Sequence, residues 1–235
     1  MQYIKPYTYF VKKPGGMTNL MWGSLALFST SFIPLIGQLV LLGYQSEIVD
    51  DLENDPDIAD YPDFDTSRFV PYLTRSVWPL VAQLIVGVVL LGLIFISFVV
   101  GVGAWFLTKE PLVGVLVGLV LVCPLTIFGT MLSWPMMLHA QLSQQFQFGL
   151  SLRFTNEFVR KVGGQMFVTV IVHIVIAMAI TMVGMLFFCV GMYPATVIGL
   201  MAQEHYMVQL YRLYLDQGGE PIGGPAETLM QDEEY

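Results

Sequence analysis

Charged residues are scarce in this chain, and basic ones are the scarcest. Only 12% of the 235 residues are charged, against about 25% in an ordinary soluble domain. The 10 Lys and Arg are outnumbered by 18 Asp and Glu, which gives a net charge of −8 and a pI near 4.7. Nucleic-acid binding needs clustered Lys and Arg to neutralise phosphates. The composition therefore argues against a nucleic-acid partner.

Cysteine and motifs that carry chemistry are also few. Cys123 and Cys189 both lie inside apolar runs, where a free cysteine behaves as a small hydrophobe, and their spacing matches no metal or redox motif. The sequence shows no activated nucleophile, no phosphate-binding loop and no carboxylates paired for acid–base work. The first apolar run is too long for a cleavable signal peptide. We therefore expect a protein that is not an enzyme and that holds no metal and no cofactor.

What the chain has instead is long apolar runs. Residues 77–107 and 112–138 contain no charged side chain and are separated by Lys109-Glu110-Pro111. A hydrocarbon core about 30 Å thick is crossed by roughly 20 helical residues, and in lipid a segment must satisfy its own backbone hydrogen bonds. The two runs therefore predict a transmembrane helical hairpin. A hydrophobic content of 55% and a mean hydropathy of +0.67 support an integral membrane protein.

Three further spans are predicted in the same way. Residues 18–45 are interpreted as one kinked helix, because Pro34 lies near the middle and neither half is long enough to cross a bilayer. Residues 162–203 carry no formal charge and have room for two spans and a turn. We place these spans at residues 165–188 and 194–215.

The predicted fold class is all-α: an integral membrane helical bundle of about five transmembrane helices, with interfacial amphipathic helices. The bundle occupies residues 17–215. Residues 1–16 have aromatic and aliphatic side chains at helical spacing, which predicts an interfacial amphipathic segment, with a loose chain end as the alternative. Residues 216–235 are rich in Gly, Pro and acids and are expected to be a disordered tail.

An acidic linker over residues 46–65 holds nine acids and no Lys or Arg. Three alternate acids from Asp51 onward match the first, third and fifth positions of an EF-hand loop. However, Pro56 replaces the glycine that such a loop needs, and Pro62 replaces its bidentate glutamate. We therefore expect a solvated acidic loop, with a looser divalent-cation site as the alternative.

An internal repeat is indicated by the order of the segments. Three times along the chain an aromatic amphipathic lead precedes apolar helix. In two units the second helix has a Pro-x4-Gly spacing, from Pro124 to Gly129 and from Pro194 to Gly199, and leaves the apolar run through Gln and His. Duplication explains these features. Generic Gly and Pro use in membrane helices is the alternative.

Three stretches carry a family resemblance: PLIGQLVLLGYQ, YPDFDTSRFVPYLTRSVWPL and GMYPATVIGLMAQEHYMVQLYR. With them, nearly the whole chain resembles a bacterial polytopic membrane family of unknown function. That family is distantly similar to the membrane domain fused to some glycerophosphodiester phosphodiesterases. The resemblance implies a multi-pass protein of the bacterial cytoplasmic membrane. It implies no catalytic residue, because the phosphodiesterase's soluble domain has no counterpart here.

Four polar residues in or near the predicted spans are candidate intramembrane sites: Gln83, His173, Glu204 and His205. An ionisable group inside a membrane is a functional candidate, yet neutral imidazole and amide groups also link helices by hydrogen bonds. We favour this structural interpretation for Gln83 and His173. Glu204 is expected to be an interfacial carboxylate rather than a buried one. His139 and His205 would converge if the repeats packed symmetrically, although a metal site needs further ligands.

Gly114 and Gly118 have the small-xxx-small spacing of close helix packing. Because no chemical site or charged pathway is evident, the leading hypothesis is a non-enzymatic accessory or scaffolding subunit of a membrane complex. Its partners would be other membrane proteins and lipids, or further copies of the chain as a homo-oligomer. The alternative is a small transporter or lipid-handling protein. A transporter predicts a polar cavity near Gln83 and His173, whereas a scaffold buries these groups and exposes an apolar flank.

Five spans would put the two ends of the chain on opposite sides of the membrane. The basic residues near the span ends favour the cytoplasm for the linker, the third amphipathic lead and the tail. A cysteine placed at Asp57 is therefore expected to resist an impermeant thiol reagent in intact cells.

Overall fold

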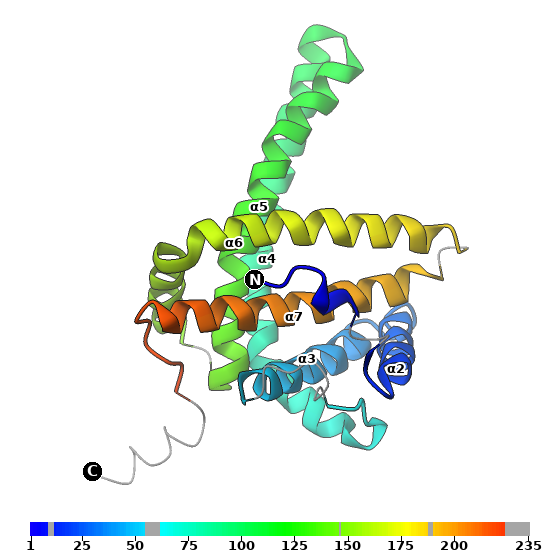
Figure 1. Cartoon of the computed structure of the whole chain (residues 1–235). Helices are drawn as coiled ribbons and strands as arrows, with labels where there is room; N and C mark the ends of the chain where they lie inside the picture. Colours follow the sequence, from blue (N-terminus) through cyan, green and yellow to red (C-terminus); the bar gives the residue numbers. More distant parts are fainter. Residues whose placement is uncertain (9–11, 55–61, 146, 188–189, 224–235) are drawn as a thin grey trace.

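A computed structural model describes residues 1–8, 12–54, 62–145, 147–187 and 190–223. In chain order its elements are η1 (Lys5–Thr8), α2 (Gly16–Ser29), α3 (Ile36–Asn54), η3 (Thr66–Arg68), α4 (Phe69–Thr108), α5 (Pro111–Ser143), α6 (Phe148–Met185) and α7 (Met192–Asp216) (Figure 1). The all-α fold class is thereby confirmed. Within the described residues three helices are long and apolar enough to cross a membrane: η3 with α4, α5 and α6.

Helices α4 and α5 form the predicted hairpin. The chain reverses at Lys109, whose φ is 62° and whose N–H donates to the Trp105 carbonyl. Pro111 then opens α5, at a position where its missing N–H loses no helical hydrogen bond. The outer part of the hairpin projects well beyond the rest of the molecule (Figure 1).

The interpretation of residues 18–45 as one kinked helix is wrong. They form two helices, α2 and α3, joined by a turn in which Leu35 has a φ of 74°. The pair is antiparallel and tightly packed. A Cβ on Gly37 would collide with the Ala26 carbonyl, and a Cβ on Gly23 would lie 3.5 Å from Leu41 Cδ1. The prediction failed because it judged a break only by the length needed to cross a bilayer.

The six α-helices of the described residues form three hairpins, α2–α3, α4–α5 and α6–α7. The first helix of each hairpin packs on the second helix of the preceding one: α4 on α3, α6 on α5 and α2 on α7. The ring of hairpins is therefore closed. The three second helices, α3, α5 and α7, also contact one another at its centre. Each predicted repeat unit therefore contains one hairpin, including the first unit, for which the sequence had predicted a single helix.

The core lies among these central helices and α6. Its fully buried large side chains include several tyrosines, namely Tyr44, Tyr72, Tyr206, Tyr211 and Tyr214. Buried phenols need partners, and the Tyr44 hydroxyl donates to the Pro62 carbonyl at 2.9 Å. Helix α7, which contains the predicted span 194–215, is mostly covered by other helices and is not among those apolar enough to span.

Much of the predicted acidic linker is helix rather than solvated loop. Helix α3 continues to Asn54, and Ser46, Ile48 and Leu52 are buried in it. The sequence pattern was misleading because the acids alternate with apolar residues that face the core. Residues 55–61, with the rest of the EF-hand-like pattern and Asp57, lie outside the described residues.

The beginning of the predicted disordered tail is bound to the bundle. Lys161 Nζ donates to the carbonyls of Gln217 and Gly218 at 2.9 and 3.0 Å, and the Ile222 N–H donates to the Tyr211 hydroxyl at 2.7 Å. Gly218 has a φ of 74°, a conformation that glycine adopts without strain. The rest of the tail, residues 224–235, lies outside the described residues.

Candidate functional site

The contact between α5 and α7 includes a buried polar pair. Gln141 Nε2 donates to Glu204 Oε2 at 3.1 Å, and both side chains have no solvent exposure. The Oε1 atom of each has no hydrogen-bond partner among the described residues. The expectation of an interfacial Glu204 is therefore wrong. A buried carboxyl is costly unless it is hydrogen-bonded, so this pair favours one register of α5 against α7.

Helix α3 carries a second buried carboxyl near its end. Glu47 is 3% exposed and binds Arg68 through both oxygens, with Arg68 Nη1–Oε2 at 3.1 Å and Nη2–Oε1 at 2.8 Å. Arg75 lies 3.7 Å from the same carboxyl and also pairs with Asp50. Burial raises the pKa of Glu47, although both guanidinium groups oppose the shift. The cluster joins α3 to the start of α4.

Each of the three central helices therefore carries buried polar side chains near the end of its apolar stretch. Besides Gln141 on α5 and Glu204 on α7, α3 buries Gln45, whose Nε2 has no hydrogen-bond partner within the part of the chain that the structure describes. From the sequence, these residues were predicted only to lie at the polar ends of spans. Their burial follows from the convergence of three helices that are far apart along the chain.

His173 on α6 is enclosed by aromatic rings. Its Nδ1 lies 2.9 Å from the Tyr7 hydroxyl, and the ring centroids of Trp134 and Tyr206 lie 5.5 and 5.8 Å from that of the imidazole. Gln83 on α4 donates from Nε2 to the Met137 sulfur at 3.0 Å. Both candidates thus have partners within the protein.

The N-terminal segment, residues 1–8, supplies part of this enclosure. The Tyr206 hydroxyl donates to the Tyr3 carbonyl at 2.5 Å, and Gln165 Nε2 donates to the Tyr3 hydroxyl at 2.7 Å. Only Lys5–Thr8 is helical, as a single 3-10 turn. The segment is therefore packed over α6 and α7, and the sequence pattern of aromatic residues reflected these contacts.

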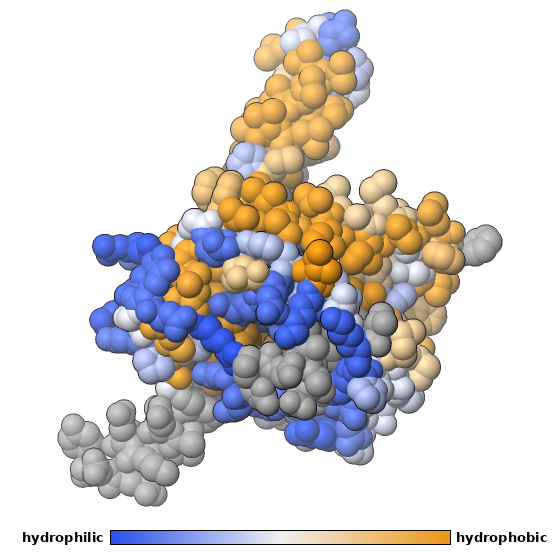
Figure 2. Space-filling model, viewed as in Figure 1, coloured by the Kyte–Doolittle hydropathy of each residue, from blue (hydrophilic) through white to orange (hydrophobic). Residues whose placement is uncertain are grey.

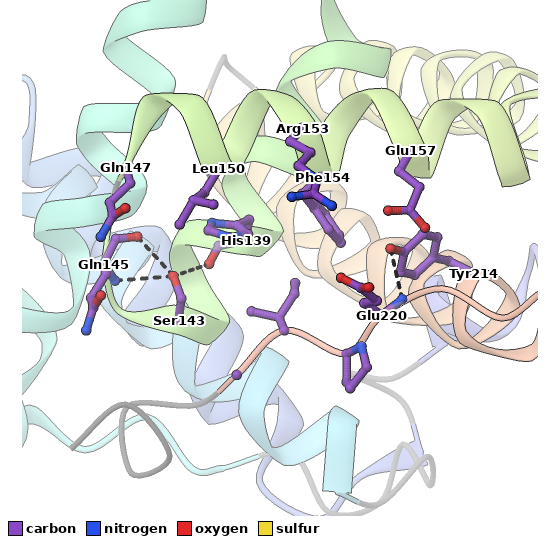
Figure 3. Close-up of a pocket in the computed structure, with 13 residues that line it drawn as sticks. His139, Ser143, Gln145, Gln147, Leu150, Arg153, Phe154, Glu157, Tyr214 and Glu220 are labelled. Carbon is purple, nitrogen blue, oxygen red and sulfur yellow. Dashed lines mark hydrogen bonds between the residues drawn. The ribbon is translucent and has the colours of Figure 1, made fainter. Parts of the chain in front are cut away.

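A polar cavity of about 320 Å³ lies between the end of α5, the start of α6 and the segment after α7 (Figure 3). His139, Arg153, Glu157 and Glu220 contribute to its lining. His139 Nδ1 lies 3.2 Å from the hydroxyl of the buried Ser151. Among the described residues, no group of three or more His, Cys, Asp or Glu is arranged to hold a metal ion.

A second polar cavity of about 800 Å³ is lined by the N-terminal segment, α6 and α7. Lys5, Gln165, His205 and Arg212 contribute to it. Arg212 Nη2 donates to the Leu52 carbonyl at 2.5 Å and so links α7 to the end of α3. His205 opens to this cavity, whereas His139 lines the first one. The structure therefore does not bring the two histidines to one site.

Two apolar grooves lie elsewhere on the molecule. One, of about 490 Å³, follows the outer hairpin and includes Gly114 and Gly118 in its lining. A Cβ on Gly114 would lie 2.7 Å from Trp105 Cβ, so this glycine permits close approach of α5 to α4, whereas a Cβ on Gly118 meets nothing within 4 Å. The other, of about 720 Å³, lies between α2 and the α6–α7 turn, with Phe28 among its lining residues. Sequence reasoning missed this second groove because it requires α2 to pack beside α7, a helix far away along the chain.

Comparison with known proteins gives a family match. A protein-family model described as "Protein of unknown function (DUF4013)" matches residues 26–189. The match is longer than half of the chain and extends from α2 to the α6–α7 turn. No curated protein and no solved structure matches the chain.

Proposed function

This chain belongs to the DUF4013 family, whose function is unknown. Because the family gives no function, we propose a role from the structure of the chain. The protein is a non-enzymatic accessory or scaffolding subunit of a membrane complex. Its principal contact with a partner is the outer part of the α4–α5 hairpin. The partner is another membrane protein.

The observation that carries this proposal is the apolar groove of about 490 Å³ along the outer hairpin, which lies within an exposed apolar surface. Leu91, Leu107 and Val120 are 70%, 87% and 70% exposed. In the most apolar 18-residue windows of α4 and α5, only 11% of the residues are buried within the chain. The groove with Gly118 in its lining lies on this surface, and small residues at such positions let a second helix approach closely.

The polar candidates support a scaffold rather than a transporter. Gln83 and His173 are bound to Met137 and Tyr7. Neither lines the two polar cavities of about 320 and 800 Å³. A transport pathway would need such groups to face a cavity near the centre of the repeats.

Matched glycine substitutions on the hairpin test the role. Gly118→Leu fills the groove, and Gly92→Leu adds the same side chain elsewhere on the hairpin. A Cβ at either position meets nothing within 4 Å, so both variants are expected to fold as the wild type does. After mild detergent extraction, Gly118→Leu should lose the membrane proteins that co-purify with the wild type, and Gly92→Leu should retain them. Equal recovery from both variants would contradict the proposed contact.

Lipid handling is the second candidate function, favoured by the groove between α2 and the α6–α7 turn. Its lining is almost entirely apolar, with Met21, Leu25 and Phe187 among its residues, which suits an acyl chain. Leu25→Trp would narrow the groove, and native mass spectrometry would report loss of retained phospholipid. We also propose that the chain lies in a bacterial cytoplasmic membrane. We propose as well that it is similar to the membrane domain of glycerophosphodiester phosphodiesterases.

A further inference from the structure

We propose that the protein meets the bilayer from one side. The α4–α5 hairpin crosses the membrane completely, whereas α2–α3 and α6–α7 enter from the same side as its base and return to it. Helix α6 is long and apolar enough to cross, but α6 and α7 run across the axis of the α4–α5 hairpin (Figure 1) and so do not reach the far side. The base of a hairpin is the end away from its turn, and the tip is the turn itself. The three bases then share one aqueous face, and the chain crosses the membrane an even number of times. This arrangement replaces the five-span topology expected from the sequence.

Direct contacts join segments that five spans would separate. In that topology residues 1–17 lie across the membrane from the linker and from the end of α7. However, Lys13 Nζ lies 3.2 Å from Asp63 Oδ1, and the Gln2 N–H donates to Gln209 Oε1 at 2.7 Å. Groups this close cannot lie on opposite sides of a hydrocarbon core that is about 30 Å thick. The N-terminal segment, the end of the linker and the end of α7 therefore lie on the same side.

Further hydrogen bonds tie the hairpin bases together. The Phe64 N–H donates to Asn19 Oδ1 at 2.9 Å, which links α2 to the segment before α4. Arg212 links α7 to the end of α3 through the Leu52 carbonyl, and Lys161 links α6 to the segment after α7. Figure 2 shows hydrophilic residues gathered on the side of the body away from the projecting hairpin, and again at the tip of that hairpin.

The tips distinguish the hairpin that crosses from those that return. The α4–α5 tip carries Lys109 and Glu110, charges that require water. Residues 84–107 form about 36 Å of helix at about 1.5 Å per residue, which suffices for a crossing. A continuous apolar surface of this length, ending in charge, fits a bilayer with water beyond it.

The other two tips are uncharged and apolar. Phe32, in the α2–α3 turn, is 73% exposed, and Phe187, in the α6–α7 turn, is 66% exposed. Ser31 Oγ lies 3.2 Å from the Tyr193 hydroxyl, so the two tips are adjacent. Helix α2 has 14 residues and is about 21 Å long, shorter than the hydrocarbon core. The turns also bond part of their own backbone, as a segment in lipid requires: the Phe32 N–H donates to the Ser29 carbonyl and the Phe187 N–H to the Gly184 carbonyl. Both tips would expose large apolar side chains if they emerged into water.

Single-cysteine labelling of the full chain in its membrane tests this topology. The background has Cys123 and Cys189 replaced by serine, and the base positions are Lys12→Cys, Thr66→Cys and Glu220→Cys. An impermeant maleimide is applied to intact cells and to inside-out vesicles, with detergent-solubilised membranes as the control for reactivity. All three base cysteines should label in one preparation, and Lys109→Cys should label in the other. Labelling of Lys12→Cys together with Lys109→Cys, opposite to the other two, would overturn the proposal.

The two returning hairpins have a test of their own. Phe32→Cys and Phe187→Cys should react with the maleimide only after solubilisation in detergent, because their tips lie in hydrocarbon. Reaction of either cysteine from the side that labels Lys109→Cys would show that its hairpin crosses the membrane, and would refute the single-sided arrangement.

Discussion

The buried pair of Gln141 and Glu204 should behave as one energetic unit. The change is to replace each by methionine, singly and together, because methionine is unbranched and fills irregular core space. Gln141→Met removes the hydrogen bond to the carboxyl, so neither oxygen of Glu204 keeps a partner among the residues described. Glu204→Met likewise leaves the nitrogen and the oxygen of the Gln141 amide without a partner in that part of the chain.

The expected magnitudes follow from burial. Leaving a fully buried polar group without a partner costs about 1–3 kcal/mol, whereas replacing both partners by apolar groups of similar shape is nearly neutral. Each single variant should therefore lose about 2 kcal/mol of unfolding free energy. The double variant should lose much less than the sum, with a coupling energy of about 1–3 kcal/mol.

Equilibrium unfolding in mixed micelles, followed by tryptophan fluorescence, measures these free energies. As a control, Glu204→Met is combined with Thr126→Val on the exposed face of α5, where the hydroxyl donates to the Val122 carbonyl of the same helix. The losses of unfolding free energy caused by these two substitutions should add to within about 0.5 kcal/mol. Additive losses for Glu204 and Gln141 as well would refute the claim that the pair is a coupled unit.

Three further predictions concern the same bundle. Tyr7→Phe removes the hydroxyl that lies 2.9 Å from His173 Nδ1 and should cost about 1 kcal/mol in the same unfolding titration. Gly43→Ala places a Cβ against the Tyr72 backbone carbonyl and should cost about 3 kcal/mol, because two packed helices must separate. Burial raises the pKa of Glu47 above its ordinary value of 4.5, so its protonated form favours the fold. Stability from this group is full below pH 4.5 and is lost as the pH rises through the raised pKa, so thermal melting of Glu47→Gln should improve relative to wild type over that interval.

Each of these has a control in the chain. Thr74→Val removes an exposed hydroxyl bond to the Val70 carbonyl near the start of α4 and should change stability less than Tyr7→Phe does. Gly87→Ala has open space for its Cβ and should be neutral or stabilising, because alanine is a better helix former than glycine. If Glu47→Gln instead lost stability relative to wild type as the pH rose, the ion pairs with Arg68 and Arg75 would outweigh the burial of the carboxyl.

Particular residues show why some expectations succeeded. Lys109-Glu110-Pro111 divides two uncharged runs, so the hairpin and its turn were evident without any tertiary contact. Gly114 and Gly118 share one spacing motif, yet a Cβ on Gly114 would collide with α4 while a Cβ on Gly118 would meet nothing within 4 Å. Spacing specifies which residues share a helix face. It does not specify which of them has room for a side chain.

The sequence by itself determined the all-α membrane class and the α4–α5 hairpin, because apolar length and backbone hydrogen bonding in lipid are local properties. Only the tertiary structure decided that α2 and α3 are separate helices, that α7 lies at the centre, and that Glu204 is buried. Glu204 and its partner Gln141 are 63 residues apart. Lys13 and Gln2 likewise contact segments far along the chain, at Asp63 and Gln209. Whether a polar side chain faces water or a partner depends on which segments the fold brings together, and no local pattern along the chain records that.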